Sequence, residues 1–398
     1  MKKVVITKLD NKGRGICFVN NKITFVPKTL PLDEVEIELF KESKKYNEAV
    51  VTKFVSVSDK RVEPVCPYYN LCDGCHLMHM SYEDTLNFKK EKVKSLLYKY
   101  AHLDKEVEIS FASSLNYRNK ITLKIVNKKI GYYKGKSHDL VEIKESLLAK
   151  SVINEVISYL DLFSISNGEV VVRTNKDKEI LLSIKTKDDV KDKEIVNEFK
   201  NIRGIVLNDK TIYGNNNLLM SINETKYQVS YNSFFQVNNE VVELIISYLE
   251  ELIPNISKAL DLYCGVGTIG LALSHKIKEL YGVEVVKNAI YNAKENAFLN
   301  NVNNAKYICG RVEDVLDKLP KYFDLIIIDP PRSGLDKKTR EFLLREEAKY
   351  LIYISCEPIS LARDLNILKE KYDPLNIKAF DMFPYTEHVE CVCVMRLR

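Results

Sequence analysis

A cysteine and two acids stand where a nucleophile and a base are expected. Cys356 follows the apolar segment 350–354 and precedes a helix that begins with proline, so we expect it at the end of a strand. The dipole of the following helix would lower the pKa of such a thiol and favour the thiolate. Asp329 ends a second apolar strand at 325–328, and Glu390 is a carboxylate in an apolar segment. Buried cysteine is often only a small apolar residue, but this position favours a nucleophile.

A glycine-rich loop marks a candidate nucleotide site. Gly265, Gly267 and Gly270 follow a predicted strand and open a helix, and Glu284 closes the next strand. Glycines at such a turn let the backbone approach a ligand, and an acid about 20 residues further on accepts hydrogen bonds from ribose hydroxyls. Tight packing of a strand against a helix is the alternative interpretation of the glycines.

The residue that precedes the loop favours one cofactor over another. NAD needs a helix N-terminus to meet its pyrophosphate, whereas S-adenosylmethionine has no phosphate and carries a cationic methionine end. Asp261 lies four residues before the first glycine, Gly265, and favours a ligand with an ammonium group. We therefore expect S-adenosylmethionine. An NAD-dependent oxidoreductase is the alternative, and it would leave Cys356 and Glu390 without a role.

A methyl donor, a thiolate and a base together indicate methylation of a pyrimidine carbon. C5 of uracil is a poor nucleophile, and addition of a thiolate to C6 makes it an enolate that attacks the methyl group. A base then removes the C5 proton, and elimination returns the cysteine. Cys356 would be the nucleophile and Glu390 a candidate acid or base.

The rest of the chain predicts three domains. Residues 1–58 contain short strand-like segments separated by turn signals, which predicts a small β-barrel. Residues 59–230 combine a cysteine cluster with a mixed α+β segment, and residues 231–398 alternate strands and helices as in a doubly wound, Rossmann-like parallel sheet. The barrel segment is rich in lysine, which is compatible with an oligonucleotide-binding barrel or with a plain β-domain. Its basic residues include Lys8, Lys12, Arg14, Lys22, Lys28, Lys41, Lys44 and Lys45.

Composition excludes several classes of protein. The 398 residues are 45% hydrophobic, so the chain can bury a sizeable core and is not disordered. Apolar runs such as 325–328 are far shorter than the roughly 18 residues of a membrane helix, and we expect no signal peptide. Nine cysteines in so long a chain do not form a disulfide framework, which favours the cytoplasm. The net charge of +5 permits a polyanionic partner, and no obligatory protein partner is evident.

These motifs resemble those of the RNA uracil-5-methyltransferase family along nearly the whole chain. The first section is similar to the RNA-binding TRAM barrel of many members, although Leu30-Pro31-Leu32-Asp33 departs from the usual Pro-Gly-Glu. The other matching motifs are Tyr117-Arg118-Asn119-Lys120, Phe234-Phe235-Gln236-Val237-Asn238, 261–268, Asp329-Pro330-Pro331-Arg332-Ser333-Gly334, Ser355-Cys356-Glu357-Pro358 and 383–390. Glu357 replaces the more frequent asparagine.

The resemblance implies a role for each matching residue. Cys356 would be the nucleophile and Glu390 the base that removes the C5 proton. The cofactor would be contacted by Gln236, Tyr263, Gly265, Glu284 and Asp329. The barrel points to 23S ribosomal RNA as substrate, because tRNA-directed relatives often lack it, and this step is an analogy between folds. A tRNA uridine-5 methyltransferase and a non-catalytic RNA-binding protein are the alternatives.

The resemblance also implies a metal site, from which this chain departs. Cys66, Cys72 and Cys75 match the spacing of a cysteine cluster that other members complete with a fourth cysteine. Ser146 stands at that fourth position. Because cubane iron–sulfur clusters are normally held by four thiolates, we expect a labile cluster with a structural role. Three thiols without a metal are the alternative.

Overall fold

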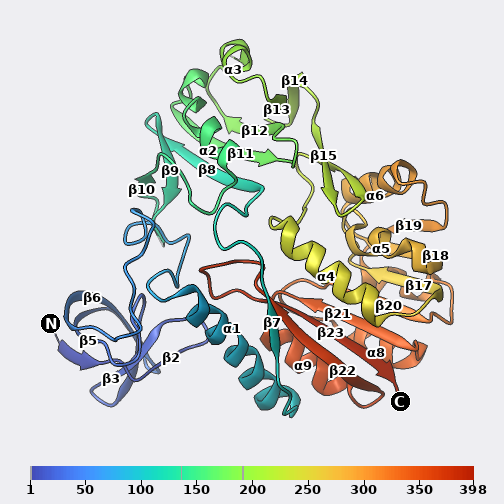
Figure 1. Cartoon of the computed structure of the whole chain (residues 1–398), viewed down its shortest axis with the longest axis horizontal. Coiled ribbons are helices and arrows are strands. Elements are labelled where there is room, and N and C mark those ends of the chain that lie inside the picture. The colour runs from blue at the N-terminus through green and yellow to red at the C-terminus, as the bar shows by residue number, and fades with distance from the viewer. Residues whose placement is uncertain (1, 136, 191) are drawn as a thin grey trace. The chain divides into compact units, whose positions relative to one another are not determined.

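The computed structural model describes residues 2–135, 137–190 and 192–398. The chain divides into two compact units, which we describe separately (Figure 1). The first unit extends to Lys92 and also includes Tyr133–Val141 and Phe383–His388. The second unit comprises Val93–Tyr132, Glu142–Met382 and Val389–Arg398. Among the described residues, none of the helices is both long and apolar enough to span a membrane.

The first unit contains a six-stranded curled sheet. Its strand order is β1-β5-β6-β4-β3-β2, and only two residues separate β1 from β2, which lie at opposite edges of the sheet. One bent segment therefore belongs to both edges, as closure of a small barrel requires. The strands are β1 (Lys2–Val5), β2 (Lys8–Leu9), β3 (Gly15–Val19), β4 (Lys22–Val26), β5 (Glu34–Glu42) and β6 (Asn47–Ser56), and helix α1 (Tyr82–Leu96) follows.

A buried carboxylate ties the barrel to the segment that follows it. The Asp33 side chain accepts hydrogen bonds from the backbone N–H groups of Leu30 (2.7 Å) and Ser58 (2.8 Å) and pairs with the Arg61 guanidinium (2.5 Å). Burial raises the pKa of Asp33, but these hydrogen bonds outweigh burial and hold the pKa below its usual value. Asp33, which belongs to the segment that departs from the family pattern, thus has partners for both of its carboxylate oxygens.

The first part of the second unit is a mixed sheet. From β9 onward its strand order is β9-β8-β11-β12-β13-β14, with one parallel pair, β12 and β13, and a separate hairpin is formed by β15 and β16. The strands are β8 (Lys120–Val126), β9 (Lys129–Tyr133), β11 (Asn167–Thr174), β12 (Ile180–Thr186), β13 (Ile202–Leu207), β14 (Lys210–Gly214), β15 (Asn217–Ile222) and β16 (Thr225–Ser230). Strand β10 (Leu140–Glu142) begins in the first unit. Helices α2 (Ser151–Ile157) and α3 (Asp192–Glu198) belong to this part.

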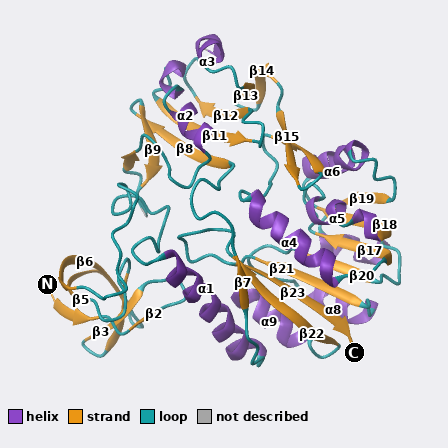
Figure 2. Ribbon diagram, viewed as in Figure 1, coloured by secondary structure: helices purple, strands orange, loops and turns teal. Residues whose placement is uncertain are grey.

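The C-terminal part is the doubly wound sheet that the sequence predicts. Eight strands lie in the order β19-β18-β17-β20-β21-β23-β22-β7, with helices on both faces (Figures 1 and 2). The strands are β7 (Glu108–Ser110), β17 (Ile256–Leu262), β18 (Ile277–Glu284), β19 (Ala305–Cys309), β20 (Leu325–Ile328), β21 (Tyr350–Ser355), β22 (Tyr372–Phe380) and β23 (Glu390–Leu397). The helices are α4 (Asn239–Leu252), α5 (Thr268–Ala272), α6 (Lys287–Leu299), α7 (Val312–Val315), α8 (Lys337–Glu346) and α9 (Pro358–Leu368).

Pairing directions in this sheet follow its connections. The strands β19, β18, β17, β20 and β21 pair in parallel because each is linked to the next through a helix, whereas β22 and β23 form the terminal antiparallel pair predicted from the sequence. β20 is entirely buried and consists of Leu325, Ile326, Ile327 and Ile328, as expected for a strand covered on both faces. The carboxyl ends of the parallel strands therefore meet at one edge.

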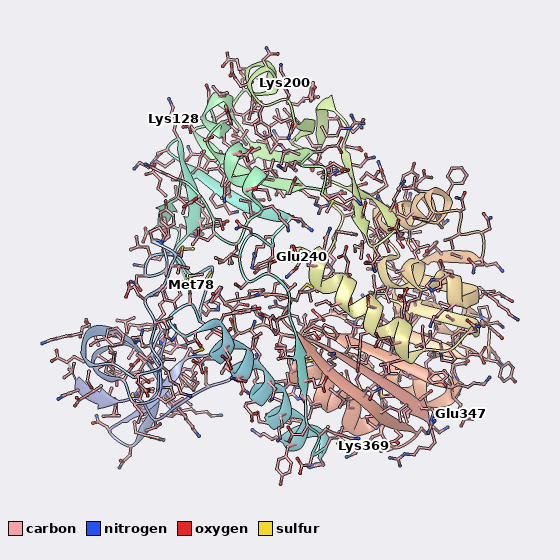
Figure 3. The ribbon with its side chains drawn as sticks, viewed as in Figure 1. Met78, Lys128, Lys200, Glu240, Glu347 and Lys369 are labelled. Atoms are coloured by element: carbon pink, nitrogen blue, oxygen red, sulfur yellow. The ribbon has the colours of Figure 1, made fainter. Side chains whose placement is uncertain are left out.

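Helix ends fix the segments around this edge. Asn238 caps α4, Asp336 caps α8, and Glu357 caps α9, each by accepting a hydrogen bond from a backbone N–H. At the first turn of α4, Glu240 accepts hydrogen bonds from the Lys150 ammonium group (2.9 Å) and the Ser113 N–H (3.4 Å) (Figure 3). These contacts attach the mixed sheet and the loop after β7 to the helix that precedes β17.

Candidate active site

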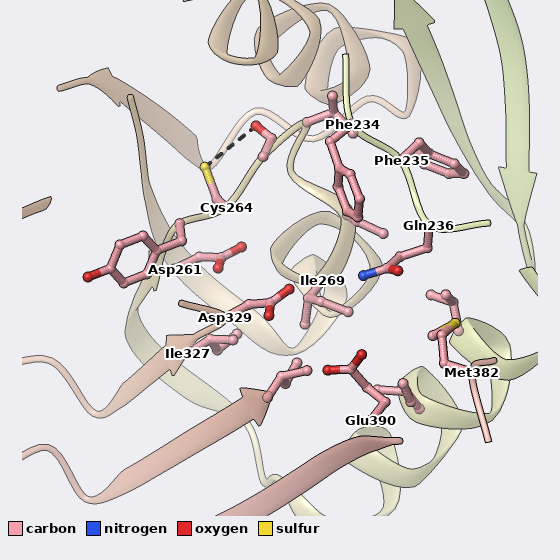
Figure 4. Close-up of a pocket in the computed structure, with 17 residues that line it drawn as sticks. Phe234, Phe235, Gln236, Asp261, Cys264, Ile269, Ile327, Asp329, Met382 and Glu390 are labelled. Atoms are coloured by element: carbon pink, nitrogen blue, oxygen red, sulfur yellow. Dashed lines mark hydrogen bonds between the residues drawn. The ribbon is translucent and has the colours of Figure 1, made fainter. Parts of the chain in front are cut away.

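A cavity that is partly open to solvent lies at the carboxyl edge of the parallel strands. It is lined by the 234–236 segment, the loop after β17, the ends of β20 and β21, and Glu390. The side chains of Gln236, Asp329 and Glu390 converge on its interior from three different segments (Figure 4). The carboxyl ends of the strands are where α/β sheets bind small ligands.

The loop after β17 depends on left-handed backbone. Gly265 has φ 56° and Gly267 has φ 83°, values that side chains disfavour. A Cβ at Gly265 would meet nothing within 4 Å, so this glycine leaves its space to a ligand, whereas a Cβ at Gly267 would come within 2.9 Å of the Tyr307 hydroxyl. The Gly265 N–H donates to Glu284 (3.2 Å), which also accepts from the Val286 N–H (2.8 Å). Glu284 therefore stands beside the loop, as the motif predicts.

Three carboxyl groups line the cavity. The pKa of Asp261 is raised to about 8, chiefly by burial and also by the neighbouring Asp329 and Glu284, while a hydrogen bond from the Gly270 N–H (3.1 Å) opposes the rise. Burial also raises the pKa of Asp329 and of Glu390. Grouped acids in a dry site favour a cationic ligand, because a positive charge would relieve their repulsion. The lining therefore fits the sulfonium and ammonium groups of S-adenosylmethionine.

The antiparallel register places Cys356 opposite Glu390. Ser355 on β21 pairs with Cys391 on β23, so the next position in the register brings these two residues together. Glu390 is buried and Cys356 is partly buried. Burial raises the pKa of the Cys356 thiol, the Glu390 carboxyl raises it further, and a hydrogen bond with the Arg332 guanidinium opposes both. The structure thus brings the two predicted catalytic residues close enough for an electrostatic interaction.

The expected lowering of the pKa of the Cys356 thiol is wrong. The first turn of α9 is capped by Glu357, which accepts a hydrogen bond from the Ile359 N–H (3.4 Å). A carboxylate at the cap offsets the positive end of the helix dipole. Burial and the Glu390 carboxyl then decide the direction of the shift, and the resting thiol keeps its proton more firmly than a free cysteine.

Arg332 is a functional candidate to which sequence reasoning gave no role. It contributes the cation that faces both Cys356 and Glu390, and it lowers the pKa of both groups. The loop that carries it is braced by Ser360, whose hydroxyl donates to the Arg332 carbonyl oxygen (2.6 Å). Asp364 on α9 accepts from the Leu335 N–H (2.9 Å) and from the Tyr353 hydroxyl (2.7 Å). The sequence feature that could have indicated a role for Arg332 is its charge directly after Asp329-Pro330-Pro331.

Gln236 is held by backbone contacts while its side chain faces the cavity. Asn119 donates to the Gln236 carbonyl oxygen (2.9 Å) and to the Asn239 side chain (2.7 Å), and its N–H donates to the Val237 carbonyl oxygen (2.9 Å). Asn238 donates to the Met382 carbonyl oxygen (3.3 Å). The motif 117–120 therefore supports the 234–238 segment from behind.

Tyr263 lines the cavity in a different way from the other predicted contacts. Its backbone has φ 63° and turns the chain into the glycine loop. Its ring packs against the hydrophobic core, and its hydroxyl bonds to Thr339 at the start of α8. Burial raises the pKa of Tyr263 to about 12. The residue shapes the loop and offers the cavity little of its aromatic face.

The structure does not support the predicted iron–sulfur cluster on Cys66, Cys72 and Cys75. Within residues 2–135, 137–190 and 192–398, no three His, Cys, Asp or Glu side chains are grouped so that they could hold a metal ion. The Cys72 sulfur accepts a hydrogen bond from the Gly74 N–H (3.3 Å), and burial raises the pKa of its thiol, which disfavours the thiolate that iron requires. Ser146 is held through its backbone by Asn154, at 2.9 and 3.1 Å.

The fold and cavity define a Rossmann-like S-adenosylmethionine-dependent methyltransferase, and comparison with known proteins agrees. The sequence model for tRNA (uracil-5-)-methyltransferases matches residues 174–398. An uncharacterized RNA methyltransferase of Clostridium tetani is 33% identical over 98% of this chain and 95% of its own length. One from Staphylococcus aureus (strain MSSA476) is 31% identical over 100% of this chain and 98% of its own length.

A solved structure is similar over the whole length. The Pyrococcus abyssi tRNA (uracil-54, C5)-methyltransferase in complex with S-adenosyl-L-homocysteine is 28% identical, with a TM-score of 0.84. The match covers 99% of this chain and 100% of that one. The chain therefore belongs to the tRNA (uracil-5-)-methyltransferase family, and the protein is an RNA methyltransferase. The oxidoreductase and non-catalytic alternatives are set aside.

Proposed function

We propose that this protein methylates C5 of a uridine in RNA through a covalent bond between the Cys356 sulfur and C6 of the uracil. The observation that carries the proposal is the register of β21 and β23, which places Cys356 opposite Glu390 beside a cavity that suits S-adenosylmethionine. A thiol, a carboxylate and a guanidinium in mutual electrostatic contact are the parts that such a reaction needs.

The residues divide the work as follows. The Cys356 thiolate adds to C6, which places the electron pair on C5 and O4 of the ring as an enolate. When bound, the cofactor would supply a methyl group as an electrophile: the C5 pair would form the new carbon–carbon bond while the bond between the methyl group and the sulfonium sulfur breaks and S-adenosylhomocysteine leaves. Glu390, as carboxylate, then takes the C5 proton, and the returning electrons expel the Cys356 sulfur from C6 and restore the double bond.

The surroundings of Glu390 suit the removal of the C5 proton. Burial and the nearby Asp329 raise the pKa of Glu390, so its carboxylate holds an abstracted proton more firmly than an exposed glutamate would. Arg332 lowers the pKa of Glu390 and so favours its carboxylate form. The same guanidinium favours the Cys356 thiolate that begins the reaction.

For the RNA, we propose a uridine of 23S ribosomal RNA, with transfer RNA as the second candidate. The N-terminal barrel supports the first, because tRNA-directed members of the family often lack it. The second is favoured by the P. abyssi protein, which acts on uracil 54 of tRNA and is matched over 99% of this chain. A relative with a matched N-terminal section thus has a tRNA substrate. Mapping 5-methyluridine in both RNAs, with and without this gene, separates the two.

Trapping the covalent intermediate tests the mechanism. Glu390→Gln should add to RNA and transfer the methyl group but fail to release, leaving a protein–RNA adduct that survives a denaturing gel. Cys356→Ala should form no adduct and show no turnover. Cys309→Ala, which removes an exposed thiol, is the control and should keep ordinary activity. Ordinary methylation by Cys356→Ala would overturn the mechanism.

A further inference from the structure

The hairpin β15–β16 leaves one strand edge unpaired by any other strand, and helix α6 covers it. Strand β16 pairs with β15 alone, so the N–H and C=O groups on its outer side need other partners. These partners are asparagine side chains spaced four residues apart, at positions 292 and 296 on α6 and at position 300, which caps the C-terminus of the helix. Four helical residues rise about 6 Å, close to the roughly 6.8 Å of two strand residues.

The asparagines pair with the strand edge as another strand would. Asn300 accepts from the Lys226 N–H (2.9 Å) and donates to the Lys226 carbonyl oxygen (2.7 Å). Asn296 accepts from the Gln228 N–H (2.6 Å), and Asn292 donates to the Gln228 carbonyl oxygen (3.1 Å). The hairpin is therefore fixed in register along the helix.

Asn296 makes one contact that the other two asparagines do not make. Its Nδ2 donates to the Val266 carbonyl oxygen (3.1 Å), in the middle of the glycine loop. The side chain is fully buried, so neither its acceptor nor its donor can be replaced by bulk water. One amide thus joins the hairpin edge to the loop that forms one side of the cavity.

Tyr227 on β16 reaches both sides of the same cavity. Its hydroxyl donates to the Thr268 carbonyl oxygen (2.9 Å) at the start of α5. Its ring lies against Phe235, with ring centroids 5.6 Å apart, next to Gln236. Thr268 and Phe235 both line the cavity, and Tyr227 is completely buried.

We infer that Asn296 and Tyr227 are positioning residues for the methyl donor, and that the seam between α6 and β16 sets the spacing between the glycine loop and the 234–236 segment. Neither residue needs to touch the ligand. Both act by holding the carbonyl groups of Val266 and Thr268 against a hairpin that also packs against Phe235 through the Tyr227 ring. The inference rests on the proposed use of this cavity by S-adenosylmethionine.

Paired Asn→Asp variants test the inference. Asn296→Asp keeps the acceptor for Gln228 but turns a carboxylate oxygen toward the Val266 carbonyl oxygen. Asn300→Asp makes the same change one turn along the helix, with the same hairpin and no contact with the glycine loop. We expect Asn296→Asp to weaken S-adenosylhomocysteine binding about 10-fold or more in calorimetry, and Asn300→Asp to leave it nearly unchanged.

A milder variant keeps the test valid if Asn296→Asp folds poorly. Tyr227→Phe removes only the hydroxyl that bonds Thr268 and keeps the ring against Phe235. It should raise the KM for S-adenosylmethionine by roughly 3- to 10-fold while kcat at saturating donor stays near that of the parent. Tyr231→Phe, which removes an exposed hydroxyl bonded to Asp209 at 3.1 Å, is its control.

The outcomes separate this inference from the proposed function. Glu284→Ala should weaken S-adenosylhomocysteine binding if the cavity is the donor site. Unchanged binding in Glu284→Ala would overturn that assignment. Weakened binding in Glu284→Ala, together with unchanged donor affinity in Asn296→Asp and Tyr227→Phe, would overturn the positioning role. A fall in the unfolding temperature without a change in KM would do the same, because it would show that the seam stabilises the fold only.

Discussion

Cys356 and Glu390 occupy facing positions just beyond the last paired residues of β21 and β23, and the carboxyl raises the pKa of the thiol. Burial acts in the same direction, and Arg332 acts against both. The nucleophile and the base are therefore coupled before any RNA binds. The thiolate is favoured when the carboxyl group is neutral or when the guanidinium is close.

This coupling predicts opposite effects on thiol reactivity. Glu390→Gln removes the carboxyl group whose charge raises the pKa of Cys356, so alkylation by iodoacetamide should become faster at a pH high enough to ionise that carboxyl group. Arg332→Met removes the opposing cation, so alkylation should become slower. Each change should be several-fold, since one pKa unit changes the thiolate fraction about 10-fold.

The exposed Cys309 is the internal reference for that experiment. Mass spectrometry of the two peptides gives the Cys356 rate relative to the Cys309 rate in every variant. Changes in the same direction for Glu390→Gln and Arg332→Met would contradict the arrangement of charges described above.

Binding of the methyl donor should release protons. Burial raises the pKa of Asp261 to about 8, so at neutral pH its carboxyl is mostly protonated. A cation bound beside it favours the carboxylate, lowers the pKa and expels the proton. Calorimetry at pH 7 in buffers of different ionisation enthalpy should show up to about one proton released per ligand. At about pH 9.5, where Asp261 is already ionised, the release should vanish. Binding heats independent of the buffer at pH 7 would contradict the prediction.

Asp364 should contribute strongly to the stability of the loop that carries Arg332. Asp364→Ala would leave the Leu335 N–H and the Tyr353 hydroxyl without a partner in the interior. We expect the free energy of unfolding to fall by about 2–4 kcal/mol. Denaturant titration measures it, with Asp317→Ala as control, because Asp317 is exposed and only pairs with Arg345 at 3.6 Å. Equal decreases in the free energy of unfolding of the two variants would show that Asp364 does not specifically stabilise the loop that carries Arg332.

Lysines of the barrel should account for part of the salt dependence of RNA binding. Lys12, Lys44 and Lys45 are exposed, and their replacement by glutamine removes three charges from the first unit. The slope of log K against log salt should become shallower by about 0.7–0.9 for each phosphate that the variant no longer neutralises. A matched variant with Lys337, Lys338 and Lys349 replaced by glutamine in the second unit should change the slope less. An unaltered slope in the barrel variant would contradict a role in RNA binding.

Local patterns in the sequence were sufficient for much of the fold and for the membership of the site. Apolar strands that alternate with helices predict the doubly wound sheet, and the carboxyl ends of parallel strands necessarily share an edge. The order of strands and turns along the chain was therefore enough to place Gly265, Glu284 and Asp329 beside one another. Cys356 was singled out because it follows an apolar strand, and Glu390 because it is a carboxylate in an otherwise apolar segment.

The electrostatics of the site were decided only by the tertiary structure. The pKa of Cys356 moves opposite to the predicted direction because burial raises it and because the Glu390 carboxyl, brought near by the pairing of β21 with β23, raises it further. Tyr263 has a left-handed backbone and packs against the hydrophobic core, although it also lines the cavity. The second bond of Asn296 depends on a glycine loop 30 residues earlier in the chain. A sequence pattern shows which residues reach an edge, whereas burial and the charges brought beside them decide what each residue does there.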